Sequence, residues 1–444
     1  MRISVYALSI LALFISRESS ASEADACLSI ESLRIAQACL NKISPFSRIQ
    51  QASSGERVIA STVTSIQGPY SQFTGSDPEQ LRSPLLAKAL ENEGKHLRVN
   101  MGPVDPQRLS YDITLDTFTD GSAAYHGAMM ASTYGPDVSG RDIATWYHRQ
   151  RLGAGYVATV SATHGFSDLR PESKGGDYRS IFLDAEKAFV FGLANLSYSF
   201  TDNSAGGESL IYVLGGETHR YSASLTNWIN KSWKVTQKIE HTEREQDFGV
   251  FDIYTEQQYT SGVLEAAYEA KGIEISAKAK KGLSGNETYD LIPLMGSFNP
   301  YYWSAEVEAK AKIQLADRLS VSGRFDAFKG AQDMPSSERI GLGGIGAGSS
   351  HESGLYTGYK GFQHDLSVRY DLVRGEGYKL VAKAGIDGAD IRTAMDDELS
   401  LQSAELGLEF HSRKWSVVTG YSKSIKTTNL EDDQRLNAQL IWRY

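Results

Sequence analysis

The sequence predicts an all-β protein, a 16-stranded antiparallel transmembrane β-barrel that follows a small α+β segment. From residue 106 onward, apolar and polar residues alternate in short runs separated by turn residues, which is the period of a strand with one apolar side. No stretch is apolar for the roughly 18 residues that a spanning helix needs, and the mean hydropathy is -0.33. The aromatic residues recur near the expected strand ends, as interfacial girdles require.

The first 21 residues have the features of an export signal. Met1 and Arg2 precede an apolar run over 3–15, and Ser19 and Ala21 suit a small-residue cleavage site. A membrane anchor is the alternative, but about thirteen apolar residues are too few to cross a hydrocarbon core of about 30 Å as a helix. We therefore expect residues 1–21 to be removed from the mature protein.

Residues 22–105 have a different pattern, which predicts one small or degenerate periplasmic module. The spacing favours a strand over 58–66, a helix over 78–92 and a strand over 97–99, with a further helix that begins after Ser29. This α+β segment is expected to end at the proline-containing connection 103–106.

Cys27 and Cys39 are the two cysteines of the chain. If both lay on one helix they would be about 18 Å apart, too far for a disulfide. They can bond only if the chain reverses between them, and otherwise they are free thiols.

Residues 106–444 are expected to form the barrel. Short connections alternate with long ones, which is typical of an outer-membrane barrel. A soluble barrel is the alternative, but sixteen strands enclose a lumen too wide for side chains to fill. Eleven strands are expected before a long glycine-rich loop and five after it. They cover 109–116, 125–133, 157–163, 178–190, 193–200, 221–225, 233–241, 259–270, 273–280, 303–315, 318–328, 363–372, 378–387, 404–410, 415–422 and 436–444.

The polar faces of these strands carry charges of both signs, which we expect to face an aqueous lumen. Mixed charge suits transient contact with an extended chain, although the same residues would line any porin. The expected lumen-facing residues are Glu306, Glu308, Lys310, Lys312, Arg324, Asp326, Arg369, Asp371 and Lys383.

The last strand ends the chain on an aromatic residue. Leu436, Ala438, Leu440, Trp442 and Tyr444 share one face and alternate with polar residues, with Ile441 as the exception. Such an ending resembles the signal that the barrel-assembly machinery reads in bacterial outer-membrane proteins, with Trp442 and Tyr444 as its aromatic residues. An ordinary last strand is the alternative.

The long connection at 330–361 is dense in glycine, and a loop of this length is usually functional or disordered. We interpret it as a pore loop, with a flexible surface loop as the alternative. Its motif residues are Ser336, Glu338, Arg339, Leu342, Gly343 and Gly344.

The glycine-rich loop resembles the sixth extracellular loop of the two-partner-secretion transporters, the hemolysin secretion and activation family. The resemblance rests on the motif residues above, on Glu352 to Gly354, and on Gly358-Tyr359, which lead into the next strand. The block 111–127 resembles the first two barrel strands of that family. The resemblance implies a POTRA-plus-barrel protein, with a shortened periplasmic region here, located in the bacterial outer membrane. It also implies that a secreted partner pairs with an edge of the periplasmic module and threads through the lumen.

The chain departs from the family at the loop tip. Family members carry an arginine there that pairs with an acidic strand residue, whereas residues 346–350 contain no arginine. Arg339 and Arg324 are the candidates to replace it.

We expect no enzymatic activity. No metalloprotease or phosphate-binding motif occurs, and the neighbours His364 and Asp365 would point to opposite faces of a strand. No cofactor or metal is expected, and a net charge of -9 gives no reason to expect nucleic acid. The expected partners are outer-membrane lipid and lipopolysaccharide, the assembly machinery and a secreted exoprotein, with a monomeric chain. A passive porin or a surface receptor is the alternative function.

Overall fold

The computed structural model describes residues 48–50, 58–67, 88, 92, 95–105, 110–119, 124–132, 142–153, 155–166, 177–189, 191–204, 216–230, 232–248, 253–289, 299–351 and 356–443. The expected export signal, the helix after Ser29, Cys27, Cys39, residues 352–355 and Tyr444 lie outside these residues.

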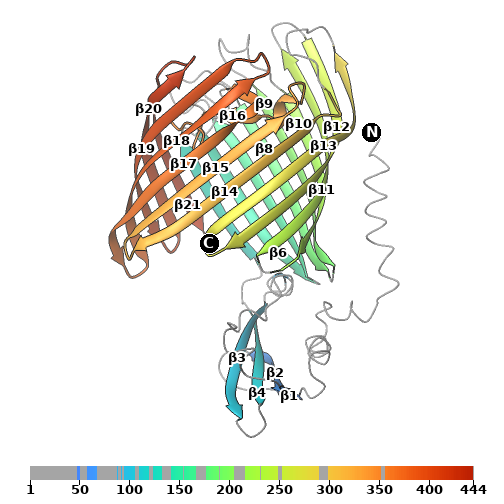
Figure 1. The fold of residues 1–444 in the computed structure, drawn as a ribbon, viewed down its shortest axis with the longest axis vertical. Coiled ribbons are helices and arrows are strands. Elements are labelled where there is room, and N and C mark those ends of the chain that lie inside the picture. Colours follow the sequence, from blue (N-terminus) through green and yellow to red (C-terminus); the bar gives the residue numbers. More distant parts are fainter. Residues whose placement is uncertain are drawn as a thin grey trace. The chain divides into compact units, whose positions relative to one another are not determined.

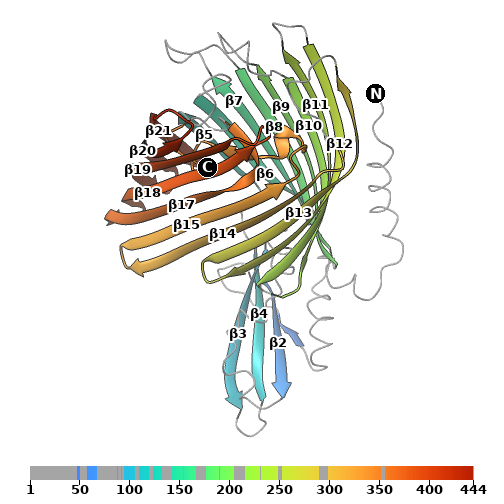
Figure 2. The same ribbon diagram turned by 45° about the horizontal axis from the view of Figure 1, so that its top comes forward.

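Four strands before residue 120 form a sheet of their own. They are β1 (Arg48–Gln50), β2 (Val58–Gln67), β3 (Lys95–Asp105) and β4 (Ser110–Thr119), in the order β1-β2-β4-β3, and every pairing is antiparallel. Figure 2 shows β2, β4 and β3 side by side. Residues 88 and 92 are helical, within the helix expected at 78–92.

The strand expected at 109–116 is β4 of this small sheet, so its assignment to the barrel was wrong. Both edges of β4 are occupied, by β2 and by β3, and the barrel begins only at Ala124. Alternation indicates a strand with one apolar side, but the pattern is the same whichever sheet the strand joins.

Sixteen strands form a closed antiparallel barrel (Figure 1), which confirms the predicted fold. Eleven precede the long loop and five follow it. They are β5 (Ala124–Ser132), β6 (Asp142–Gly153), β7 (Tyr156–Phe166), β8 (Asp177–Phe189), β9 (Gly192–Ser204), β10 (Gly216–Trp228), β11 (Trp233–Phe248), β12 (Ile253–Ala270), β13 (Ile273–Tyr289), β14 (Trp303–Ala316), β15 (Leu319–Gly330), β17 (Tyr356–Gly375), β18 (Tyr378–Thr393), β19 (Glu398–Ser412), β20 (Trp415–Thr428) and β21 (Gln434–Arg443).

The strand count is correct because two errors cancel. Strand β4 was counted in error, and β6 was missed. On β6, one face carries Trp146 and His148 and the other carries Tyr147 and Arg149. Both faces therefore mix apolar and polar groups, and the two-residue period that identifies a strand is weak.

The outward face of the barrel is apolar and exposed. Ile313, Leu315, Leu406 and Leu436 are 51 %, 60 %, 66 % and 66 % exposed. So many exposed aliphatic side chains on successive strands would be unfavourable in water but are favourable in contact with lipid. Within the described ranges, no helix is long and apolar enough to cross a membrane.

At one end of the barrel, two-residue connections join neighbouring strands, for example β12 to β13 and β14 to β15. Longer connections lie at the other end. Aromatic residues begin several strands directly after these short turns. Tyr378 and Trp415 are both about half exposed there, and the Trp415 ring lies 6.1 Å from the Trp442 ring, centroid to centroid. This is the expected interfacial girdle on the side of the short turns, which face the periplasm in outer-membrane barrels.

Candidate functional site: a loop docked inside the barrel

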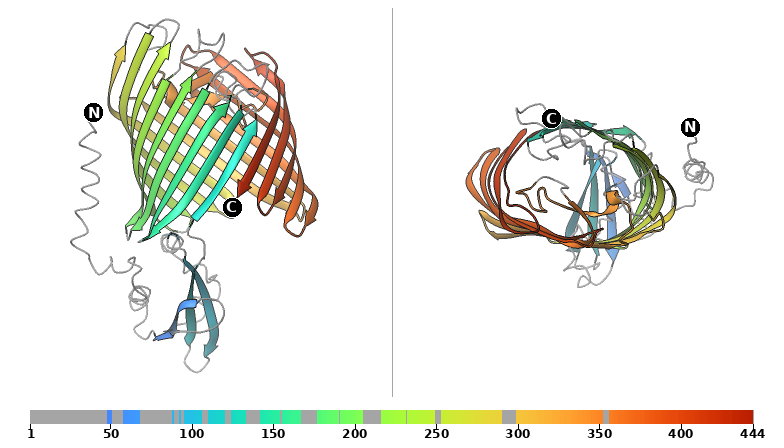
Figure 3. Two further views of the ribbon diagram at one scale, coloured as in Figure 1. Left: turned by 180° about the vertical axis from the view of Figure 1, so that it is seen from behind. Right: turned by 90° about the horizontal axis from the view of Figure 1, so that it is seen from above.

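The connection between β15 and β17 folds into the ring of strands, as the view from above shows (Figure 3, right). It contains a 3-10 turn at Ser336–Glu338 and the short strand β16 (Ile340–Leu342), which pairs with the start of β17. Strand β17 begins at Tyr356, so the last residues of the loop expected at 330–361 belong to a strand. The described part of the loop is held at two places on the barrel wall.

The first anchor is the carboxylate of Glu338. Lys280 Nζ on β13 donates to Glu338 Oε2 at 2.6 Å. Arg220 Nη2 on β10 and Tyr259 Oη on β12 donate to the other oxygen, Oε1, at 3.2 Å and 3.0 Å. Both carboxylate oxygens are therefore bound, by donors from three different strands.

The residues beside Glu338 extend this anchor. Because the Tyr259 hydroxyl donates to Glu338, the Ser337 hydroxyl must donate to Tyr259 Oη, at 2.9 Å. Arg244 Nη1 on β11 donates to Ser336 Oγ at 2.9 Å. The three side chains of the 3-10 turn thus all bind the same stretch of wall, β10 to β13.

Glu338 is part of a buried ion cluster that includes Lys280, Glu240 and Lys238 of the wall. Lys280 Nζ also contacts Glu240 Oε2 at 2.5 Å, and Lys238 Nζ contacts Glu240 Oε1 at 2.5 Å. The side chains of Lys280, Glu240 and Glu338 are only 5 %, 8 % and 9 % exposed. Buried charges that lose a partner are strongly destabilising, so the cluster favours the docked loop.

Arg339 braces the loop internally. Its Nη2 donates to the carbonyl oxygens of Met334 at 3.0 Å and Gln332 at 3.3 Å. Burial lowers the pKa of the Arg339 guanidinium, and the nearby Asp333 carboxylate partly offsets this. The other candidate for the missing tip arginine, Arg324, pairs with Glu308 at 2.9 Å and Asp326 at 2.8 Å on the wall. In neither case does an arginine join the loop to an acidic strand residue.

The tip of the loop needs glycine. Gly343, Gly344, Gly346 and Gly348 have φ values of +92°, +87°, +84° and +110°, a region that residues with a Cβ rarely adopt. The chain can therefore turn tightly over this stretch and present successive backbone N–H groups to one side.

Those N–H groups bind Asp387 on β18, which forms the second anchor. The backbone N–H groups of Gly346, Gly348 and Ser349 donate to Asp387 Oδ2 at 3.0, 3.1 and 2.8 Å, and Ser349 Oγ donates to Oδ1 at 2.8 Å. A carboxylate accepting several N–H groups is strongly held. The loop tip thus binds an acidic strand residue through its backbone and one hydroxyl, and not through an arginine.

Next to this anchor, a chain of hydrogen bonds fixes the tautomer of a buried histidine. His351 Nε2 lies 2.9 Å from the carbonyl oxygen of Glu431, so it must carry the proton and donate. Nδ1 then accepts from the Ser350 hydroxyl at 2.9 Å, and the Ser403 hydroxyl on β19 donates to Ser350 Oγ at 2.8 Å. The loop tip is therefore also tied to β19 and to the connection after β20.

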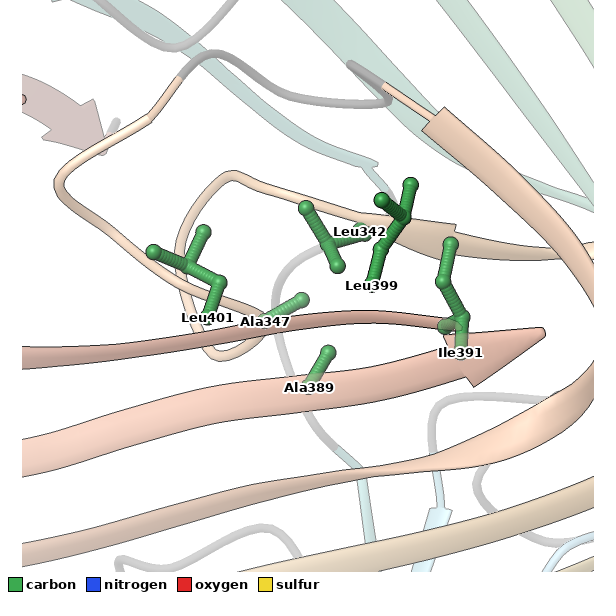
Figure 4. Packing of buried hydrophobic residues seen from close by; sticks show 6 residues of the cluster. All are labelled: Leu342, Ala347, Ala389, Ile391, Leu399 and Leu401. Carbon is green, nitrogen blue, oxygen red and sulfur yellow. The ribbon is translucent and has the colours of Figure 1, made fainter. Parts of the chain in front are cut away.

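Apolar packing completes the second anchor. Leu342 and Ala347 of the loop face Ala389, Ile391, Leu399 and Leu401 of β18 and β19 (Figure 4). These strand residues lie on the face opposite the lipid-exposed Ile386 and Leu406. A lumen wall that is apolar at this place fits a docked loop, because water alone would favour polar residues there.

Most of the residues expected to face the lumen form ion pairs, within a strand or between strands, on the face opposite the lipid-exposed one. Arg324 bridges Glu308 and Asp326, and Lys310 contacts Glu308 at 2.7 Å. Further pairs are Lys278–Glu306 at 2.8 Å, Arg369–Glu409 at 3.2 Å and Lys383–Glu405 at 2.6 Å. Asp371 instead pairs with Arg374 at a short turn, and Lys312 lies on the same face of β14 as Lys310.

Of the six expected motif residues, Ser336 and Glu338 contact the first wall, Arg339 contacts the loop backbone, and Leu342, Gly343 and Gly344 shape the tip. The wall partners Arg220, Tyr259, Lys280 and Asp387 were not predicted. Lys280 and Asp387 are charged residues on the inner face of their strands. This was the only signal in the sequence that could have identified them as partners of the loop, and many other residues have the same property.

The fold and the docked loop define the class of protein: an outer-membrane β-barrel whose lumen holds an inward-folded loop. Comparison with solved structures gives the particular fold. CdiB from Escherichia coli matches with a TM-score of 0.67 at 13 % identity, covering 96 % of this chain and 88 % of that one. CdiB from Acinetobacter baumannii matches with a TM-score of 0.59 at 11 % identity, covering 80 % of this chain and 67 % of that one.

BamA from Haemophilus ducreyi, in a structure lacking POTRA domains 1–3, matches with a TM-score of 0.54 at 10 % identity, covering 81 % of this chain and 78 % of that one. The sequence matches no family model and no curated protein. The chain therefore shares the barrel fold of these outer-membrane proteins, as the loop motif indicated, and its location is the bacterial outer membrane.

Proposed function

We propose that this barrel translocates or activates a secreted protein partner, of the hemolysin or adhesin type, across the outer membrane. The observation that carries the proposal is the loop itself, which lies inside the lumen and is held on two separate walls by hydrogen bonds, ion pairs and apolar contacts. All of these contacts are reversible. A transporter needs a lumen that is occupied at rest and can be cleared, whereas a passive porin needs one that stays open.

The fold supports the same function, since CdiB and BamA share it. The wall supports it as well. Acids and bases of the wall are paired with each other, as in Lys383–Glu405 between the neighbouring strands β18 and β19 and Arg369–Glu409 between β17 and β19. A wall of mutually paired charges offers weak, transient contacts to a passing chain.

The remaining partners follow from the same proposal. The four-stranded sheet β1 to β4 would receive the client in the periplasm, by addition of a client strand to a sheet edge. Trp442 and Tyr444 would be read by the barrel-assembly machinery. The apolar outer face would contact outer-membrane lipid and lipopolysaccharide, with the chain as a monomer.

A reversible lock on the loop tests the proposal. The hydroxyl oxygens of Ser350 and Ser403 are 2.8 Å apart, so the double variant Ser350→Cys/Ser403→Cys can form a disulfide from loop to wall. The matched control is Ser322→Cys/Ser367→Cys, whose hydroxyl oxygens are 2.9 Å apart on the paired strands β15 and β17. Both are made with Cys27 and Cys39 replaced by serine.

We expect the oxidised loop lock to stop the appearance of a large protein in the medium of the native cells, and a reductant to restore it. The control pair should have no effect. If deletion of the chain removes no protein from the medium, and single-channel conductance is large and steady with or without residues 336–353, the barrel is a porin or receptor and the proposal fails.

A further inference from the structure

The site that binds Glu338 is a complete receptor for a carboxylate. Arg220 and Tyr259 bind one oxygen and Lys280 binds the other. Two of these donors are almost fully buried, with Tyr259 at 1 % and Lys280 at 6 % exposure as whole residues. Nothing in this geometry depends on the carboxylate being part of the loop.

The site keeps its positive charge when the loop leaves. Within the described residues, Arg220 forms an ion pair with Glu338 and with no other acid. Lys280 retains Glu240, which already serves Lys238. Withdrawal of Glu338 would therefore leave the Arg220 guanidinium, whose side chain is 35 % exposed even with the loop docked, and an ammonium that shares Glu240. The vacated site would carry an excess of positive charge that attracts another anion.

We propose that this is an exchange site, and that an acidic side chain of the translocating protein takes the place of Glu338 when the loop moves aside. This inference rests on the proposed transport function. It explains what neutralises the excess positive charge of the site when the loop leaves: the client supplies the replacement carboxylate as it enters.

The loop also indicates what kind of client segment fits. Ser336 and Ser337, directly before Glu338, bind Arg244 and Tyr259 through their hydroxyls. A client segment with small hydroxyl residues immediately before Glu would reproduce the same contacts. The substrate class is therefore an extended polypeptide with Ser-Ser-Glu-like sites, and basic segments would be repelled.

Chemical rescue tests the receptor. In planar bilayers, Glu338→Ala should raise the fraction of time in the open state by at least about tenfold, because it removes the acceptor of three donors and a single hydrogen bond to a charged group is worth about that much. Acetate, as a free carboxylate, should fill the vacated site and reverse most of that increase, whereas chloride at equal ionic strength should not. Asp317→Ala, which removes an acid paired with Arg374 at a short turn, should show neither effect.

Peptide competition on the unaltered chain tests exchange. A peptide with repeated Ser-Ser-Glu should increase opening when added from the short-turn side, and the same peptide with Gln in place of Glu should not. If acetate fails to reverse the Glu338→Ala effect, or both peptides act alike, the exchange site is wrong even when the loop lock blocks export. If acetate rescue and selective peptide opening occur but no export is found, the receptor stands and only the transport function fails.

Discussion

Asp387 of β18 accepts hydrogen bonds from both the backbone N–H and the hydroxyl of Ser349, each at 2.8 Å, on its two different carboxylate oxygens. This pair places the loop tip against the wall in one orientation only. It also explains how the tip can dock without an arginine, because glycine-rich backbone supplies the donors instead.

Removing the charge of Asp387 should release the tip. In Asp387→Asn, one acceptor oxygen becomes an NH₂ donor that faces either three N–H groups or the Ser349 hydroxyl. We expect amide hydrogen exchange at 346, 348 and 349 to accelerate by roughly ten- to a hundredfold, the size of a lost hydrogen bond to a charged group. Asp390→Asn, on the opposite face of the same strand, is the control, and equal acceleration in both variants would contradict the assignment.

The tip glycines should differ in their tolerance of a side chain. A Cβ at Gly346 would meet no atom within 4 Å, whereas a Cβ at Gly348 would collide with the Leu401 side chain. Gly346→Ala therefore carries only the strain of positive φ, about 1–2 kcal/mol, and Gly348→Ala adds a steric clash. Limited proteolysis of the loop should be faster in Gly348→Ala than in Gly346→Ala, and the reverse order would rule out the described packing.

The apolar part of the second anchor predicts a contrast within one strand. Leu401 is 1 % exposed against the loop, and Leu406 is 66 % exposed on the lipid face. Leu401→Ala should weaken loop docking by about 2–5 kcal/mol, as for other buried leucines, and should increase channel opening. Leu406→Ala should leave the opening unchanged; a similar increase from both would mean that general barrel destabilisation is the cause.

The proposed role of Trp442 as an assembly signal can be distinguished from its structural role in packing against Trp415. Trp442 and Trp415 pack against each other, so a purely structural role predicts equal loss of folded barrel in Trp442→Ala and Trp415→Ala. An assembly signal predicts that Trp442→Ala lowers the amount of barrel in the outer membrane several-fold more than Trp415→Ala. Heat-modifiable mobility on a gel measures the folded fraction.

The sequence by itself determined the class of fold and the position of the inward loop, whereas the count of sixteen barrel strands was correct only because two errors cancelled. Alternation with a period of two is a local property, and it can be read wherever one face of a strand meets lipid and the other meets water. It failed at β6, where both faces are mixed, and it could not tell that β4 belongs to the small sheet, because the pattern does not name the partner strand.

Only the tertiary structure decided what holds the loop. Glu338 lies 58 residues from Lys280 and 118 residues from Arg220 along the chain, and barrel closure brings them together. The motif residues could be found from the sequence because the tip conformation requires glycine and because they resemble a known loop. Their partners could not, since which inward residue of which strand meets the loop depends on the tilt and register of the closed barrel.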